Sequence, residues 1–247
     1  MNTLSETSRN LTGLMIALGI ILVWGGSLIF LLSLNINWSV FLWIPLVLWQ
    51  TFFYTGLFIT AHDAMHGSVF PPNRILNDTI GAVSVILFAL FSYRKLKRKH
   101  SEHHRFPGTR KDPDFHDGHN RGIVRWYFHF LRGYIGWRQL AGMALIFNVL
   151  EHLLNVPVQN LIAFWIMPSL LSTVQLFYFG TYLPHRETEI TFTDHHRARS
   201  NEYPVFWSFL TCFHFGYHLE HHLYPSSSWW RLPVVRKNFV RSFIDAK

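Results

Sequence analysis

Residues 11–33 read L-T-G-L-M-I-A-L-G-I-I-L-V-W-G-G-S-L-I-F-L-L-S and carry no charged side chain. Because about 20 consecutive apolar residues in a helix cross the hydrocarbon core of a bilayer, this stretch predicts a transmembrane helix. Its length and the lack of a clear cleavage site argue against a removable signal peptide. A second uncharged run, 39–61, follows after only five residues, so the two runs are expected to form a helical hairpin.

Further apolar runs complete the predicted membrane domain. Residues 139–155 predict a third span, and residues 159–183 predict a fourth span that Pro168 is expected to bend. The shorter stretch 79–93 is expected to lie at the membrane interface or to re-enter the membrane. We therefore expect a single all-α integral membrane domain, residues 1–247, with a four-helix transmembrane bundle and a histidine-rich helical cap formed by residues 62–138 and 184–247.

The charge distribution predicts which side of the membrane the cap faces. Charged residues make up only 15% of the chain, yet Lys and Arg outnumber Asp and Glu by 22 to 14. The basic residues flank the apolar runs, and none lies in the short loops 34–38 and 156–158. By the positive-inside tendency, both termini and both cap segments are expected in the cytoplasm. This topology explains the basic balance without nucleic acid, for which the sequence has no motif.

Histidines gather at the predicted cytoplasmic ends of the spans. Three boxes have the spacing of metal ligands: H-D-A-M-H at 62–66, H-S-E-H-H at 100–104 and H-L-E-H-H at 218–222. Helical residues three or four positions apart share a face, so each box can direct at least two imidazoles to one point. The candidate metal ligands are the box histidines and one histidine that follows the fourth span: His62, His66, His100, His103, His104, His185, His218, His221 and His222.

The number of these histidines indicates how many ions they bind. Buried imidazoles repel one another as cations and need partners as neutral rings, and metal ions supply such partners. Eight or nine nitrogen ligands exceed what one ion uses, so we expect two ions, and open positions among imidazole ligands suit iron. The carboxylates inside the boxes are expected to accept the second ring N–H and fix the tautomer; they are Asp63, Glu102 and Glu220. The single cysteine, Cys212, excludes an internal disulfide.

The boxes and their neighbours resemble a known family. Three histidine boxes separated by hydrophobic spans are similar to those of the membrane di-iron superfamily of fatty-acid desaturases, hydroxylases and alkane monooxygenases. The resemblance narrows to bacterial-type beta-carotene ketolases at H-D-A-M-H-G (62–67), D-P-D-F-H (112–116), F-G-T-Y-L-P-H-R (179–186) and F-H-F-G-Y-H-L-E-H-H-L-Y-P (213–225). It extends over residues 60–225 and, in the arrangement of spans, over nearly the whole chain.

This resemblance implies an O2-dependent di-iron ketolase of carotenoid biosynthesis. The expected reaction places a keto group at C4, and at C4′, of beta-ionone rings by two successive hydroxylations and loss of water, which converts beta-carotene to echinenone and canthaxanthin. The implied partners are the carotenoid substrate, including hydroxylated carotenoids, the lipid bilayer and a ferredoxin-type electron donor. The implied location is a bacterial or cyanobacterial cell membrane. The resemblance also makes Asp112, Asp114 and His116 candidates for supporting the ligands or contacting the substrate.

Other residues are candidates for the substrate site or its support. His214 lies four residues before His218 and is expected to share its helix face, as a ligand or as support for one. A carotenoid has no polar headgroup, so its pocket should be apolar, aromatic and open to lipid. The aromatic candidates near the cytoplasmic halves of the spans are Phe52, Phe53, Phe58, Phe177, Tyr178 and Phe179. Ordinary packing in the bundle or contact with lipid is the competing interpretation of each.

Two other functions share part of these observations. A fatty-acyl desaturase or lipid hydroxylase would carry the same boxes, and it differs mainly at D-P-D-F-H and in the sequence around His185 and His218. A non-enzymatic membrane metal-binding or transport protein would place its ionisable ligands within the spans, whereas these histidines cluster beyond them. The basic run 94–99 is typical of a segment at the lipid headgroups and also suits an acidic electron donor.

Overall fold

The computed structural model describes most of the chain. The described residues are 3–35, 40–116, 118, 121–188 and 192–244. Within these ranges the chain forms helices joined by loops and contains no strand, as the all-α prediction requires. The first residue of the predicted second span and parts of both predicted cap segments lie outside the described residues.

Among the described residues, three helices are long and apolar enough to cross a membrane. The first is Leu11–Ser33 within α1 (Thr3–Ser33), and the second is α2 (Trp43–Met65), which follows a short 3₁₀ turn, η1 (Val40–Leu42). The third, Val158–His185, is a continuous helix. It consists of α7 (Val158–Asn160), η3 (Leu161–Ile166), α8 (Met167–Phe177), η4 (Tyr178–Tyr182) and α9 (Leu183–His185). Three of the four predicted spans therefore have structural candidates.

The remaining predicted span, 139–155, corresponds to a shorter helix. It consists of α6 (Trp137–Asn148) and the π-helical turn η2 (Val149–Leu153). Such a helix rises about 25 Å at 1.5 Å per residue, whereas the hydrocarbon core is about 30 Å thick. A fourth crossing at this position therefore stays a prediction.

The stretch 79–93 is helical and sharply bent. It lies in α3 (Arg74–Ala89) and α4 (Tyr93–Arg105), whose axes meet at 103°. Leu90, at the break, adopts a left-handed conformation with φ 56°. A bend of this size suits either a broken span or a re-entrant segment, and the sequence predicts the latter or an interfacial helix.

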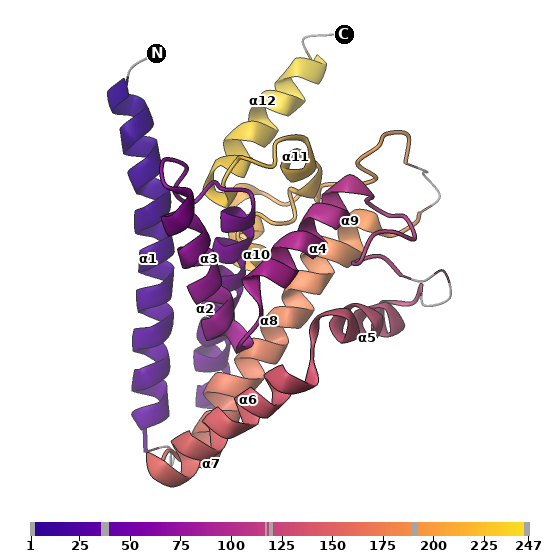
Figure 1. Cartoon of the computed structure of the whole chain (residues 1–247). Coiled ribbons are helices and arrows are strands. Elements are labelled where there is room, and N and C mark those ends of the chain that lie inside the picture. The colour runs from indigo at the N-terminus through magenta and orange to yellow at the C-terminus, as the bar shows by residue number, and fades with distance from the viewer. Residues whose placement is uncertain (1–2, 36–39, 117, 119–120, 189–191, 245–247) are drawn as a thin grey trace.

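The spans pack around α2, which lies between α1, α3 and α8 (Figure 1). Tyr54 is fully buried at the centre of α2 and contacts the ring of Trp24 edge-on, with 5.4 Å between ring centroids. Some of the polar groups between the spans are hydrogen-bonded to each other, which offsets the cost of burying them. Thr55 Oγ1 lies 2.9 Å from Ser172 Oγ, so a hydrogen bond joins α2 to α8.

Further helices lie in the predicted cap segments. They comprise α4, α5 (Ile123–Tyr134), α10 (Val205–Cys212), α11 (His218–Leu223), η5 (Trp229–Arg231) and α12 (Leu232–Ile244). Figure 1 shows the start of α1, the end of α12 and the short helix α11 at the same end of the molecule. Phe213 and His214 have φ angles of 48° and 61°, and these two left-handed residues turn the chain from α10 into α11. The turn leads directly into the last histidine box on α11.

Candidate metal centre

The nine predicted ligands meet in two clusters. The five-histidine cluster contains His62, His66, His100, His104 and His221. The four-histidine cluster contains His103, His185, His218 and His222. Within each cluster the candidate ligand atoms all lie within 4.8 Å of one another, which is close enough to surround one ion. The structure therefore assembles every predicted ligand, although the residues come from four distant segments.

Each H-x2-H-H box is divided between the two clusters. On α4, the i,i+4 pair His100 and His104 faces the five-histidine cluster, while His103 faces the other. On α11 the division is reversed. The pair His218 and His222 belongs to the four-histidine cluster, and His221 belongs to the five-histidine cluster. Because residues three and four positions apart share a helix face, one face of each helix supplies rings to both clusters, which adjoin each other at His104 and His222.

The ring nitrogens have the spacing of ligands around a cation. His104 Nε2 lies 3.1 Å from His100 Nε2 and 3.0 Å from His221 Nε2. In the second cluster, His222 Nε2 lies 3.1 Å from His218 Nε2 and 3.2 Å from His103 Nε2. Nitrogens bonded at right angles to one metal ion at about 2.1 Å would be about 3.0 Å apart.

The protonation of these rings also fits a bound metal. Burial, reinforced by neighbouring imidazoles, holds the pKa of His218, His221 and His222 well below its usual range. The rings are therefore neutral and direct lone pairs at one another, an arrangement that a cation stabilises. The Nε2 atoms of His62 and His185 are buried and have no hydrogen-bond partner among the described residues. The donor set thus fits two imidazole-bound metal ions, for which iron is a suitable element.

Two ligands of the four-histidine cluster are oriented by hydrogen bonds on the far side of the ring. His103 Nδ1 lies 3.0 Å from both carboxylate oxygens of Asp112, and His185 Nδ1 lies 2.7 Å from the carbonyl oxygen of Arg197. A carboxylate and a carbonyl only accept, so each Nδ1 carries the proton and each Nε2 is left free for a metal. Burial raises the pKa of Asp112, but the hydrogen bond from His103 contributes to holding this pKa below its usual range.

The three carboxylates inside the boxes occupy different surroundings. Asp63 Oδ1 lies 3.7 Å from His62 Nδ1, while Asp63 Oδ2 accepts a hydrogen bond from the Trp229 backbone N–H. Glu220 is buried and accepts from Ser200 and, at 2.8 Å, from Arg236. Glu102 is exposed and lies 3.9 Å from Arg98 on its own helix. Of the three, the structure brings only Asp63 close to a ligating ring.

The other predicted supporting residues differ in how close they lie to the clusters. Asp114 Oδ2 lies 3.9 Å from His103 Nδ1. His116 is buried against Trp126 and accepts a hydrogen bond at Nδ1 from the Gly118 N–H, so it lies outside both clusters. His214 also lies outside them and stacks on Tyr217, with ring centroids 5.7 Å apart.

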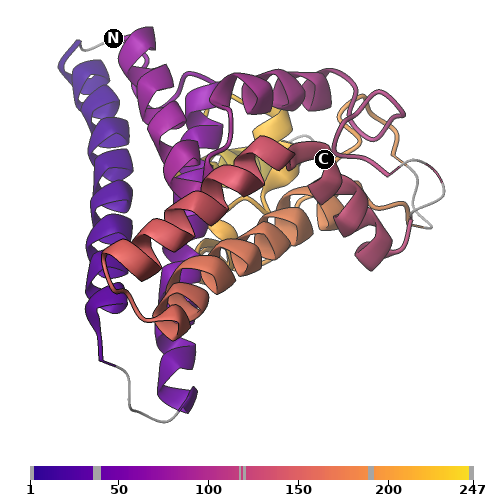
Figure 2. The same cartoon turned by 60° about the horizontal axis from the view of Figure 1, so that its bottom comes forward.

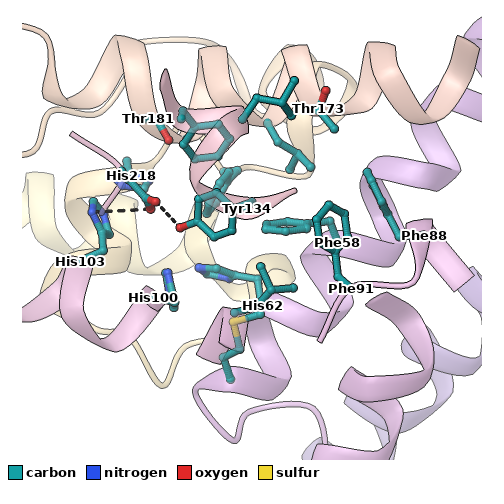
Figure 3. A pocket seen from close by; sticks show the side chains of 18 residues that line it. Phe58, His62, Phe88, Phe91, His100, His103, Tyr134, Thr173, Thr181 and His218 are labelled. Atoms are coloured by element: carbon teal, nitrogen blue, oxygen red, sulfur yellow. Dashed lines mark hydrogen bonds and ion pairs between the residues drawn. The ribbon is translucent and has the colours of Figure 1, made fainter. Parts of the chain in front are cut away.

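An apolar cavity opens onto both clusters (Figure 3). His62 and His100 of the first cluster and His103 and His218 of the second line one end, and phenylalanine rings line the other. Its wall contains Phe58, Met65, Phe88, Phe91, Leu96, Asp114, Phe130, Leu131, Tyr134, Thr173, Leu176, Gly180, Thr181 and Phe215 in addition to these histidines.

Only Phe58 of the six predicted aromatic residues lines this cavity. Phe52 stacks on Phe213, and Phe53 packs against Trp49 and Phe52. The last three lie on other faces of the third span. Phe177 is buried against Trp126, Tyr178 stacks on Tyr182, and Phe179 lines a different, more polar pocket with Arg186 and Arg199. The structure thus gives these five residues packing positions outside the cavity.

Tyr134 is a cavity residue that sequence reasoning missed. Its hydroxyl donates a hydrogen bond to Asp114, which in turn lies beside His103 (Figure 3). Trp126 Nε1 donates to the Asp114 backbone carbonyl at 2.8 Å and helps to hold the same loop. Neither residue belongs to a histidine box or to D-P-D-F-H, so no motif in the sequence singles them out.

Comparison with known proteins agrees with this architecture. A family model described as "Fatty acid desaturase" matches residues 36–149 and 132–246. Fold and histidine clusters therefore define a protein of the fatty acid desaturase class.

Named relatives narrow the class. The "Beta-carotene ketolase" of Paracoccus sp. (strain N81106 / MBIC 01143) is 48% identical over 187 residues, covering 75% of this chain and 76% of the relative. That of Paracoccus sp. (strain PC1) is 48% identical over 193 residues, covering 78% of each. A "Zeaxanthin 4-ketolase" of Chlamydomonas reinhardtii is 37% identical over 245 residues, covering 92% of this chain and 54% of that protein. The chain belongs to the beta-carotene ketolases, which confirms the resemblance seen in the motifs.

Proposed function

We propose that this protein oxidises C4, and C4′, of the beta-ionone rings of beta-carotene, giving echinenone and canthaxanthin. One structural observation carries the proposal: the apolar cavity ends on ring faces of both histidine clusters, so a hydrocarbon ring bound there lies beside both metal positions. The names of the relatives support the choice of substrate, and the zeaxanthin-specific name supports hydroxylated carotenoids as a second substrate class.

The histidine clusters would hold two iron ions, which supply O2 activation and electron transfer when bound. The His103 Nδ1–H is held by Asp112 and the His185 Nδ1–H by the Arg197 carbonyl, so both rings keep Nε2 unprotonated for the metal. Phe58, Phe88 and Phe215 surround the reacting ring and exclude bulk water from it.

The reaction balances with an external reductant. In each hydroxylation, one O2 with two electrons and two protons inserts one oxygen atom into a C–H bond and releases the other as water. A second hydroxylation at the same carbon gives a gem-diol, which loses water to form the ketone. The electrons would come from a ferredoxin-type donor, and the basic residues of α4 offer such an acidic partner a complementary surface.

The proposed location is a bacterial or cyanobacterial cell membrane, with both termini and the cap in the cytoplasm. The basic residues concentrate in the cap, and the start of α1 and the end of α12 lie at the same end of the molecule as α11. The same end holds the clusters, which would make them accessible to a soluble cytoplasmic donor.

Expression in a host that makes beta-carotene tests the proposed function. Pigment extracts analysed by mass spectrometry should contain products whose masses match one and two keto groups. Unaltered beta-carotene together with changed fatty acids would contradict the proposal and favour a desaturase or lipid hydroxylase. Unaltered pigments and lipids, with metal bound, would favour a non-enzymatic metal-binding protein.

A further inference from the structure

A second apolar hollow, the side groove, adjoins the metal-facing cavity. It lies between α6 and the third span, which run beside each other in both views (Figures 1 and 2). Phe88, Phe91, Leu131 and Thr173 line both hollows, so the two are adjacent and share a wall. The groove has a volume of about 330 Å³.

We propose that the side groove holds the polyene chain of the carotenoid while the metal-facing cavity holds its ring. This inference rests on the proposed function and extends it to a binding site for the rest of the substrate. One ring fills only the cavity, whereas the conjugated chain attached to it must leave through the wall. The wall shared with the side groove, formed by Phe88, Phe91, Leu131 and Thr173, is where the chain would pass.

The lining of the groove suits a flat conjugated chain. Phe147 of α6 and Trp165 of η3 both line it, with ring planes 19° apart and centroids 6.4 Å apart. Aromatic faces of this kind stack favourably on a planar π-system. The polar side chains of the groove are occupied elsewhere: Gln139 donates to the Ala89 carbonyl, and Asn148 donates to the Ala144 carbonyl at 2.8 Å. The wall therefore presents mainly hydrocarbon.

The groove is also open toward the apolar exterior. Leu140 and Leu170 line it and are 57% and 50% exposed, one on each side. None of the α6 residues is buried, so this helix covers the groove without being part of the core. A lipid-dissolved substrate could enter sideways between α6 and α8, ring first, and reach the clusters without crossing water.

Ala144 provides a direct test because it is exposed and lines the groove. An indole at this position would occupy the space of the polyene chain. Ala141→Trp is the matched control, since Ala141 lies on the same helix, is also exposed and does not line the groove. Neither position is in the metal site, so both variants should keep their metal and their fold.

Binding is measured without oxygen, so that it does not depend on catalysis. Detergent-solubilised wild type, Ala144→Trp and Ala141→Trp are mixed with beta-carotene under anaerobic conditions, and pigment retained per chain is read by absorbance after gel filtration. Wild type and Ala141→Trp should bind alike, and Ala144→Trp should bind about tenfold less or weaker still. Affinity for beta-ionone, a ring without the long chain, is measured by calorimetry and should change less than about twofold.

The outcomes separate the two proposals. Equal beta-carotene binding by Ala144→Trp and wild type would overturn the proposal that the side groove holds the polyene chain. The groove would then be a site for the acyl chains of membrane lipid. Equal losses for beta-carotene and beta-ionone would also overturn it, because the substitution would then have disturbed the cavity as a whole. If the variants bind beta-carotene as expected but wild type forms no keto products in air, the proposed oxidation is contradicted and the proposed polyene site is not.

Discussion

The two histidine clusters differ in how their rings are held and shielded. All four rings of the four-histidine cluster are buried, and two of them are fixed from behind by Asp112 and the Arg197 carbonyl. In the five-histidine cluster, His66, His100 and His104 are only half-buried. The four-histidine cluster depends on loops that follow α4 and α9, whereas the five-histidine cluster depends on helix faces. The two proposed metal positions therefore differ in how rigidly their ligands are held and in how accessible they are to solvent.

Removing a ligand should have the largest effect and should reveal this inequality. His218→Ala and His66→Ala each remove one imidazole, from the buried and the more exposed cluster respectively. Either change should lower ketolase activity by at least about a hundredfold, because even supporting residues commonly cost 10- to 100-fold. Added imidazole should restore part of the activity of His66→Ala and none of that of His218→Ala. Rescue of both variants alike would show that the clusters are equally accessible.

Loss of a supporting carboxylate should have the next largest effect. Asp112→Asn keeps the shape of the side chain but weakens the hold on the His103 Nδ1–H, so metal affinity should fall about 10- to 100-fold. Titration with a chelator, followed by iron analysis, should show release of one ion before the other. Glu102→Gln is the matched control, since Glu102 is exposed and lies 3.9 Å from Arg98 on its own helix. Unchanged chelator resistance in Asp112→Asn would contradict the role given to this carboxylate.

Substitution of Tyr134 should act mainly on stability. Tyr134→Phe removes the donor to buried Asp114 and should cost about 1–3 kcal/mol, the penalty of an unsatisfied buried acceptor. Thermal unfolding in detergent measures this loss. Tyr127→Phe, which removes a hydroxyl contact with half-buried Thr173, serves for comparison and should cost less. Equal melting temperatures for Tyr134→Phe and wild type would show that the Asp114 loop needs no such donor.

The smallest effect is expected at His195. This residue is exposed and belongs to neither cluster. His195→Ala should therefore keep ketolase activity within about twofold of wild type, as is usual for surface substitutions. Strong loss of activity or iron would mean that a tenth histidine contributes to the centre.

Much of this architecture could be predicted because it depends on local patterns. Uncharged runs of sufficient length identify spans, and the i,i+3 and i,i+4 spacing of histidines identifies ligands. The boundaries were less accurate, since α2 begins at Trp43 and continues through Met65, so that His62 lies within the helix rather than after it. The division of each box between two clusters could not be predicted, because it depends on the angle at which α4 and α11 meet.

Contacts made in three dimensions explain the remaining differences. The carbonyl that orients His185 belongs to Arg197, and no side-chain motif marks a backbone acceptor. Aromatic residues were a poor guide to the cavity, because hydrophobicity does not tell which face of a buried helix adjoins a ligand. Phe58 lines the cavity while Phe52 and Phe53, two turns earlier on α2, pack against neighbouring rings.

The metal content of the purified protein tests the central claim most directly. Iron per chain should be measured by elemental analysis in wild type and in His218→Ala, in parallel with activity. The two clusters predict two iron ions per active wild-type chain and a variant that retains one, in the five-histidine cluster. A fully active wild-type protein with one iron ion or none would contradict the account.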